Sequence, residues 1–212
     1  MSKNSKEYIP TYALIAANVG VYAFTSALSG NLTTSDAVIN AFGQINLYVW
    51  NGQVWRLFTA MFVHADILHI FGNMLFLFIF GLRAEDVFDI KEYLLIYFLS
   101  GLFGGFLTLV LWPADTASIG ASGAIFGVLG ATIIYLSVHS RRSMGQSIMT
   151  ALIYAFFLFF INSAAPGVNY LAHLGGLATG LLIGYLLAVS RRPKPRVTYE
   201  HRYPSSWGSA AY

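Results

Sequence analysis

The sequence predicts an all-α, polytopic membrane protein with six transmembrane helices, and two observations carry this prediction. Of its 212 residues, 57% are hydrophobic and only 10% are charged, whereas soluble domains carry about 25% charged residues. The apolar residues also form blocks of roughly 14 to 20, the length that a helix needs to cross a bilayer. This composition excludes disordered, collagen-like and coiled-coil proteins, and the absence of Cys excludes disulfides and thiolate chemistry.

Short polar breaks separate the six predicted helices, whose ends are defined to within several residues. The helices cover residues 12–28, 67–82, 93–112, 121–138, 148–161 and 171–189. The first follows Lys3 and Lys6, as a signal peptide would, but it is long and lacks an A-x-A cleavage site, so we expect a retained helix. The fifth is the shortest and spans a ~30 Å hydrocarbon core only if flanking residues extend it. Residues 29–66 hold aromatic side chains among Gly and Asn, which indicates short helices in the outer interface.

Positive charge predicts the orientation of these helices. Eleven of the twelve Lys and Arg residues lie on one side of the predicted membrane, and only Arg56 lies on the other. By the positive-inside rule both termini are cytoplasmic, and the second, fourth and sixth helices begin at the outer face. We therefore expect a multi-pass protein of the cell membrane, with a six-helix domain over residues 1–190 and a mobile cytoplasmic tail over residues 191–212. Since the cations form no basic domain, the net charge of +3 does not indicate a nucleic-acid partner.

Polar residues interrupt three of the apolar blocks at one predicted depth. They are His64, Asp66, His69 and Asn73 at the second helix, Ser122 at the start of the fourth, and His173 at the start of the sixth. All three helices begin at the outer side, so these side chains share the outer third of the membrane. Polar groups in hydrocarbon are costly and usually face a cavity or mark a functional path. Their convergence favours a functional site.

Each of these residues, taken singly, also has a structural interpretation. A lone Ser commonly bonds to the carbonyl four residues earlier in its own helix, and a lone His near a helix end is commonly interfacial. Small residues at four-residue spacing are typical of close helix packing. They are Gly123 and Gly127 in the fourth helix, and Ala172, Gly176, Gly180 and Gly184 in the sixth. Close packing of these two helices would itself bring Ser122 near His173.

Ser and His side chains on adjacent helices are the minimal parts of an activated nucleophile, because a neutral imidazole can take the proton of the hydroxyl. His69 and Asn73 lie four residues apart on one helix face, and with the amide N–H of Ser122 they can donate to a developing oxyanion. The fourth and sixth helices contain no acid. We expect Asp66, the nearest acid, to cap the second helix instead of completing a triad. The combination indicates amide hydrolysis.

In order, spacing and topology, these motifs resemble those of the rhomboid intramembrane serine proteases. The matching pieces are Trp55-Arg56, the pattern H-x-x-x-x-H-x-x-x-N from His64 to Asn73, Gly120-Ala121-Ser122-Gly123, and Ala172-His173 followed by Gly175 and Gly176. The resemblance implies a serine endopeptidase that cuts transmembrane segments of other proteins near the outer face of a lipid bilayer. We expect no cofactor or metal, because the chain has no Cys and no recognised metal-ligand pattern. The resemblance implies Ser122 as nucleophile, His173 as general base, and His69, Asn73 and the Ser122 backbone as oxyanion hole.

The same resemblance implies supporting roles for further residues. His64 is expected close to the reacting groups, and Trp55, Arg56 and Glu85 are expected to be structural. Phe126 is a departure, because many family members carry Tyr there; it shares the Ser122 face and can stack on His173 but offers no hydroxyl. The loop over residues 162–169, together with the short fifth helix, is a candidate lateral gate for substrate.

Rival functions make different demands on the sequence. A transporter or channel would need a second polar cluster toward the inner face, which the sequence lacks. An inactive rhomboid-like binding protein does not need both Ser122 and His173. A metalloprotease would need H-E-x-x-H, whereas Ile70 follows His69. An aspartyl intramembrane protease would need paired membrane Asp residues, and only Asp66 is available.

Overall fold

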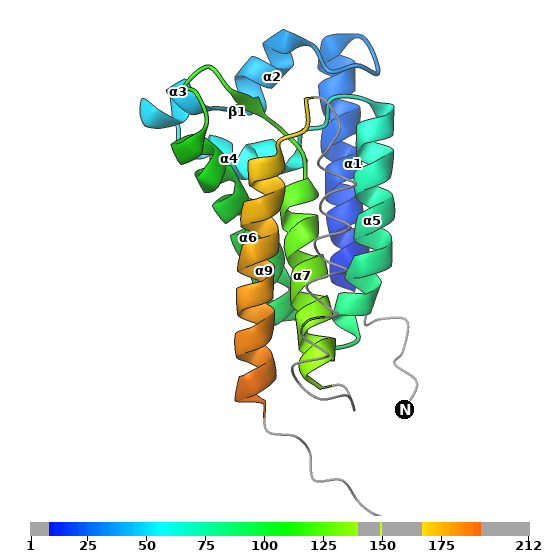
Figure 1. Cartoon of the computed structure of the whole chain (residues 1–212). Coiled ribbons are helices and arrows are strands. Elements are labelled where there is room, and N and C mark those ends of the chain that lie inside the picture. The colour runs from blue at the N-terminus through cyan, green and yellow to red at the C-terminus, as the bar shows by residue number, and fades with distance from the viewer. Residues whose placement is uncertain (1–8, 140–148, 150–166, 192–212) are drawn as a thin grey trace, which may run out of the picture.

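The computed structural model describes residues 9–139, 149 and 167–191 as a bundle of long helices with a layer of short elements at one end (Figure 1). The long helices are α1 (Ile9–Ser29), α5 (Ile67–Glu85), α6 (Ile90–Leu111), α7 (Ser122–Val138) and α9 (Tyr170–Ser190). The short elements are α2 (Asp36–Phe42), β1 (Gln44–Ile45), α3 (Asn46–Trp50), α4 (Arg56–Thr59), the 3-10 helix η2 (Ala60–Phe62) and β2 (Ala117–Ser118).

Four of the long helices, α1, α5, α6 and α9, are long and apolar enough to cross a membrane. Helix α7 is also apolar but has only 17 residues. These five elements coincide with five of the six predicted spans, with ends that differ by at most three residues. The fifth predicted span, residues 148–161, falls outside the described residues except for Met149, and so do most of the candidate gate and the tail beyond Arg191.

Polar caps explain where three of the helices begin. Asp66 caps α5 by accepting from the backbone N–H groups of Leu68 and His69. Asp89 and Glu92 form a capping box, so α6 begins at Ile90, three residues before the predicted start. Asn169 caps α9 through the N–H of Ala172. Such caps satisfy N–H groups that have no partner within the helix.

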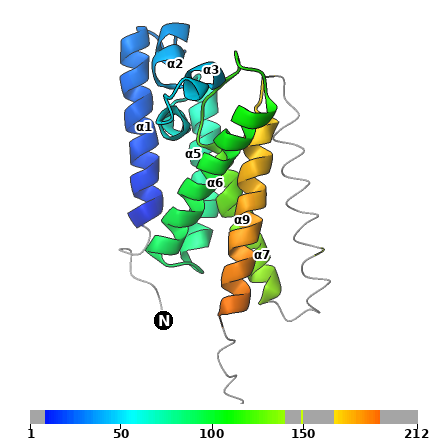
Figure 2. The ribbon, with the colours of Figure 1, turned by 90° about the vertical axis from the view of Figure 1, so that its left-hand side faces the viewer.

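Helix α7 lies inside the bundle against α5, α6 and α9, and its contact with α9 is the most extensive (Figures 1 and 2). Glycines make this contact possible. A Cβ on Gly176 would overlap the carbonyl oxygen of Gly123, and a Cβ on Gly180 would overlap that of Gly127. The predicted close packing through small residues is thereby confirmed, and it sets the first turns of α7 and α9 side by side.

The short elements lie at the end of the bundle where α5, α7 and α9 begin (Figure 1). We call this the site end, and the end where α5 and α9 stop the opposite end. Strand β1 pairs antiparallel with β2, with Gln44 opposite Ser118. Arg56 holds this layer together: its Nη1 donates to the Gly43 carbonyl at 2.7 Å and its Nε to Gln53 Oε1 at 2.6 Å. Trp55 beside it is exposed.

Candidate active site

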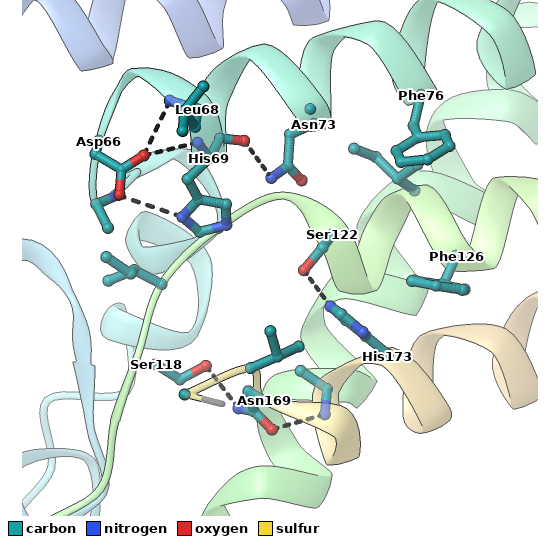
Figure 3. A pocket seen from close by; sticks show the side chains of 18 of the residues that line it. Asp66, Leu68, His69, Asn73, Phe76, Ser118, Ser122, Phe126, Asn169 and His173 are labelled. Carbon is teal, nitrogen blue, oxygen red and sulfur yellow. Dashed lines mark hydrogen bonds between the residues drawn. The ribbon is translucent and has the colours of Figure 1, made fainter. Parts of the chain in front are cut away.

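Ser122 and His173 meet in the first turns of their helices. Ser122 is the first residue of α7 and His173 the fourth of α9, and their Oγ and Nε2 atoms are 2.7 Å apart (Figure 3). The His173 ring is buried and stacks on Phe126, with centroids 4.6 Å apart and an interplanar angle of 30°. The predicted proximity and the predicted stacking are both confirmed. An imidazole with Nε2 unprotonated can accept the Ser122 proton in this geometry.

His69 directs a ring nitrogen toward the loop before Ser122. Its Nδ1 accepts from the backbone N–H of Ala65 at 3.3 Å, which in the neutral imidazole places the proton on Nε2. Gly120 has φ +116°, and a Cβ there would lie 2.9 Å from His69 Nε2. Only glycine allows both this backbone conformation and this close approach. His69 thus presents an N–H donor beside the motif that contains Ser122.

Asn73 lies one turn after His69 on α5 and lines a cavity that Ser122, His173 and His69 also line. Its Nδ2 donates to the His69 carbonyl at 2.9 Å, and its buried Oδ1 has no hydrogen-bond partner among the described residues. An amide nitrogen carries two hydrogens, so one remains for a ligand in the cavity. The hydrogen bond from Asn73 Nδ2 to the His69 carbonyl was not predicted from the helical spacing of the two residues.

Asp66 is a capping residue. Its Oδ1 accepts from the N–H groups of Leu68 and His69, each at 2.9 Å. Figure 3 shows it beyond His69, away from His173. The expectation that Asp66 caps its helix is confirmed.

His64 lies behind His69 and is not part of the cavity wall. The two rings meet edge to face with centroids 5.1 Å apart, and His64 Nδ1 is 3.2 Å from the Phe62 carbonyl. Burial, with a smaller contribution from His69, lowers the pKa of His64 to about 3, so its imidazole is neutral. The resemblance implied that His64 lies close to the reacting groups. In the structure it contacts His69 and does not itself line the cavity.

The cavity has a volume of about 660 Å³ and is lined from α5, α7, the loop before α7 and the start of α9. Its polar side chains gather near Ser122. Deeper in the bundle the lining is apolar and includes Phe76, Phe80 and Leu129. Within the described residues no group of three or more His, Asp or Glu side chains is placed to hold a metal ion.

Two cavity residues, Ser118 and Asn169, were not singled out from the sequence. The Asn169 Nδ2 donates to Ser118 Oγ at 2.8 Å, and its Oδ1 accepts from the N–H of Ala172 at 3.0 Å (Figure 3). An Asn directly before an apolar block is a recognisable capping signal. Nothing in the sequence pairs it with a Ser 51 residues away.

An apolar helical bundle with a Ser–His pair in a cavity at one end defines a membrane protein with a hydrolase-like site. Comparison with known families gives the particular assignment. The model of the rhomboid domain matches residues 51–190, and the chain therefore belongs to the rhomboid family.

Relatives in three organisms support this assignment. RHOMBOID-like protein 1 of Arabidopsis thaliana is 35% identical over 79% of this chain and 42% of its own length. Rhomboid-like protease 1 of Toxoplasma gondii is 30% identical over 76% of this chain and 54% of its own length. Rhomboid protease GluP of Bacillus subtilis is 29% identical over 85% of this chain and 35% of its own length. The chain thus spans about half the length, or less, of these curated relatives.

Proposed function

We propose that the protein is an intramembrane serine endopeptidase that cleaves transmembrane segments of other membrane proteins near the outer face. The observation that carries this proposal is the 2.7 Å contact between Ser122 Oγ and His173 Nε2 in a cavity of an apolar helical bundle. The family assignment and the protease names of two relatives support it.

In the proposed first step, Ser122 Oγ attacks the scissile carbonyl carbon while His173 Nε2 takes its proton. The carbonyl oxygen becomes an oxyanion. His69 Nε2–H, the second hydrogen of Asn73 Nδ2 and the backbone N–H of Ser122 are the donors proposed to stabilise it. The protonated His173 then gives its proton to the leaving amine, and the C–N bond breaks to leave an acyl-enzyme.

In the second step, water attacks the acyl carbon and His173 takes a proton from it. Collapse of the second tetrahedral intermediate returns the proton to Ser122 Oγ and releases the new carboxyl end. His173 therefore serves as base and then acid in each half of the cycle. A dyad suffices if stacking on Phe126 orients the imidazole, a task that a carboxylate performs in triads.

The substrate class follows from where the cavity lies. A transmembrane helix keeps its carbonyl groups inside the i to i−4 ladder, so a segment must unwind locally before Ser122 can reach one. Gly and other helix-weakening residues lower the cost of unwinding by about 1 kcal/mol or more each. We therefore propose that cleavage favours weak helical segments with a small residue at the cut.

Charge placement supports the proposed orientation in the cell membrane. Arg83, Lys91 and Arg191 all lie at the opposite end of the bundle, at the end of α5, the start of α6 and the end of α9. By the positive-inside rule that end is cytoplasmic and the site end faces outward.

The test is cleavage of a model transmembrane substrate by the purified protein in vesicles, wild type beside Ser122→Ala. Ser137→Ala, a hydroxyl deletion near the far end of the same helix, is the matched control. We expect product from wild type and Ser137→Ala and none from Ser122→Ala. Strong proteolysis by Ser122→Ala would contradict the proposal.

A further inference from the structure

We infer that Asn169 is a positioning residue that sets the alignment of Ser122 with His173, by tying the segment before one to the helix that carries the other. This inference rests on the proposed function of the Ser–His pair. It adds a residue outside the reacting groups whose side chain governs how well they meet.

The hydrogen bond between Asn169 and Ser118, which we call the bridge, joins two residues that stand at the same sequence spacing before His173 and Ser122. Ser118 lies four residues before Ser122, and Asn169 lies four residues before His173. The Nδ2 of Asn169 is 2.8 Å from Ser118 Oγ and 2.9 Å from Thr108 Oγ1. Its Oδ1 accepts from the N–H of Ala172 at 3.0 Å. One amide thus caps the helix that carries His173, bonds to Ser118 (Figure 3) and also joins α9 to Thr108 of α6.

The partners of Asn169 are themselves well fixed. Ser118 belongs to β2, which pairs with β1, and the backbone N–H of Asn46 donates to the Thr116 carbonyl at 3.1 Å. The Asn46 side chain in turn donates to the Thr108 carbonyl at 3.2 Å, at the end of α6. Thr108 is fully buried. Asn169 therefore joins α9 to a frame made of α6, β1 and β2.

The first turns of both helices need such a restraint, because helix ends fray more readily than helix centres. Ser122 is the first residue of α7, and no side chain caps that helix. The backbone N–H of His173 closes its first helical bond to the Asn169 carbonyl at 3.3 Å. Movement of either first turn changes the Oγ to Nε2 distance directly.

Helix packing is the competing explanation for the alignment. A Cβ on Gly123 would lie 3.0 Å from the Ala172 carbonyl oxygen, so α7 and α9 already touch at this level. That contact fixes the separation of the helix axes, whereas the bridge fixes the segments that enter the two helices. Removing the bridge while keeping the glycines separates the two explanations.

Two substitutions break the bridge from opposite sides. Asn169→Ser keeps an oxygen that can cap α9 but is too short to reach Ser118. Ser118→Ala removes the other partner and leaves the cap intact. A misplacement of about 1 Å costs on the order of 10²-fold in rate, so we expect each variant to lower kcat by roughly 10- to 100-fold with KM changed by less than about twofold.

The double variant tests whether both changes act on one interaction. If they do, Asn169→Ser with Ser118→Ala loses no more kcat than the worse single variant. Ser118→Thr, which keeps the hydroxyl, is expected to rescue kcat to within about threefold of wild type. Thr179→Ala removes a hydroxyl of α9 that donates to the Gly175 carbonyl at 2.8 Å, away from the cavity, and is the matched control.

The experiment measures kcat, KM and melting temperature of each variant in the full chain, beside wild type. Wild-type kcat in both bridge variants, even with a lowered melting temperature, would overturn the inference and leave Asn169 as a purely structural cap. Independent losses that add in the double variant would also overturn it. An inactive wild type would instead reject the proposed function, so the two failures are distinguishable.

Discussion

The two ends of the bundle use their polar residues in opposite ways. At the opposite end, Arg191 forms an ion pair with Glu92 and donates to Tyr135 Oη at 2.8 Å and to the Val87 carbonyl at 2.7 Å. Glu85 accepts from the backbone N–H of Thr11 at 2.9 Å and also from its hydroxyl. These bonds join helices that are far apart in the sequence.

At the site end, by contrast, a group of four polar side chains lines a cavity. Ser122, His173, His69 and Asn73 all line it. Hydrogen bonds to the backbone orient His69 and Asn73 while leaving a donor on each for a ligand. The bonds of Arg191 and Glu85 and the proposed reacting groups therefore lie at opposite ends of the bundle, and we expect substitutions at the two ends to have different effects.

The largest expected effect is the loss of proteolysis in His173→Ala. Removing the base leaves Ser122 protonated, so kcat is expected to fall by at least roughly 10⁴-fold. The melting temperature should stay near that of wild type, because the stability of the bundle comes from elsewhere. Rates of cleavage and thermal melts of the same preparation check both parts, and an active His173→Ala enzyme would contradict the role assigned to it.

Asn73→Ala is expected to lower kcat by roughly 10²- to 10³-fold through the loss of one oxyanion donor. His69→Ala should behave similarly. The measurement is kcat with a saturating transmembrane substrate. If both variants keep wild-type turnover, the two side chains are packing residues and the site end has no oxyanion hole of this kind.

Arg191→Met should reverse this pattern. Loss of its bonds to Glu92, Tyr135 and the Val87 carbonyl is expected to lower the melting temperature by roughly 2 to 8 °C, with kcat at 25 °C changed less than about twofold. Arg83→Met is the control, because Arg83 is exposed and pairs only with Asp86 at 3.0 Å among the described residues. A large loss of kcat in Arg191→Met would show that the two ends are coupled.

The smallest effect is expected for Asp66→Asn. In a triad, replacing the acid by its amide lowers kcat by about 10⁴-fold, but Asn also caps helices well. We expect a loss of less than roughly tenfold, measured as kcat beside the melting temperature. A loss near the triad value in a folded variant would make Asp66 catalytic.

Most of the long helices could be predicted from sequence, because long apolar blocks have few alternatives in a bilayer. The meeting of Ser122 with His173 could be predicted from shared depth and from glycine spacing. The start of α6 was predicted three residues too late, because the span was placed by its apolar residues alone. The capping box of Asp89 and Glu92, which the sequence does show, lies in the polar segment before them.

Other features were out of reach for a physical reason. The pairing of β1 with β2 involves two residues on each side, too few for any period to show. The bridge between Asn169 and Ser118 joins short side chains 51 residues apart, and a single hydrogen bond of this kind leaves no pattern along the chain. Both depend on tertiary placement, which the helices determine first.

The most direct test of the central claim is labelling of the wild-type protein with a fluorophosphonate probe, followed by mass spectrometry of the modified peptide. A serine activated by an imidazole attacks such a probe, whereas an ordinary buried hydroxyl does not. The account predicts modification of Ser122 in wild type and none at that position in His173→Ala. Absence of label on Ser122 in a folded wild-type protein that cleaves a transmembrane substrate, or equal labelling in His173→Ala, would contradict it.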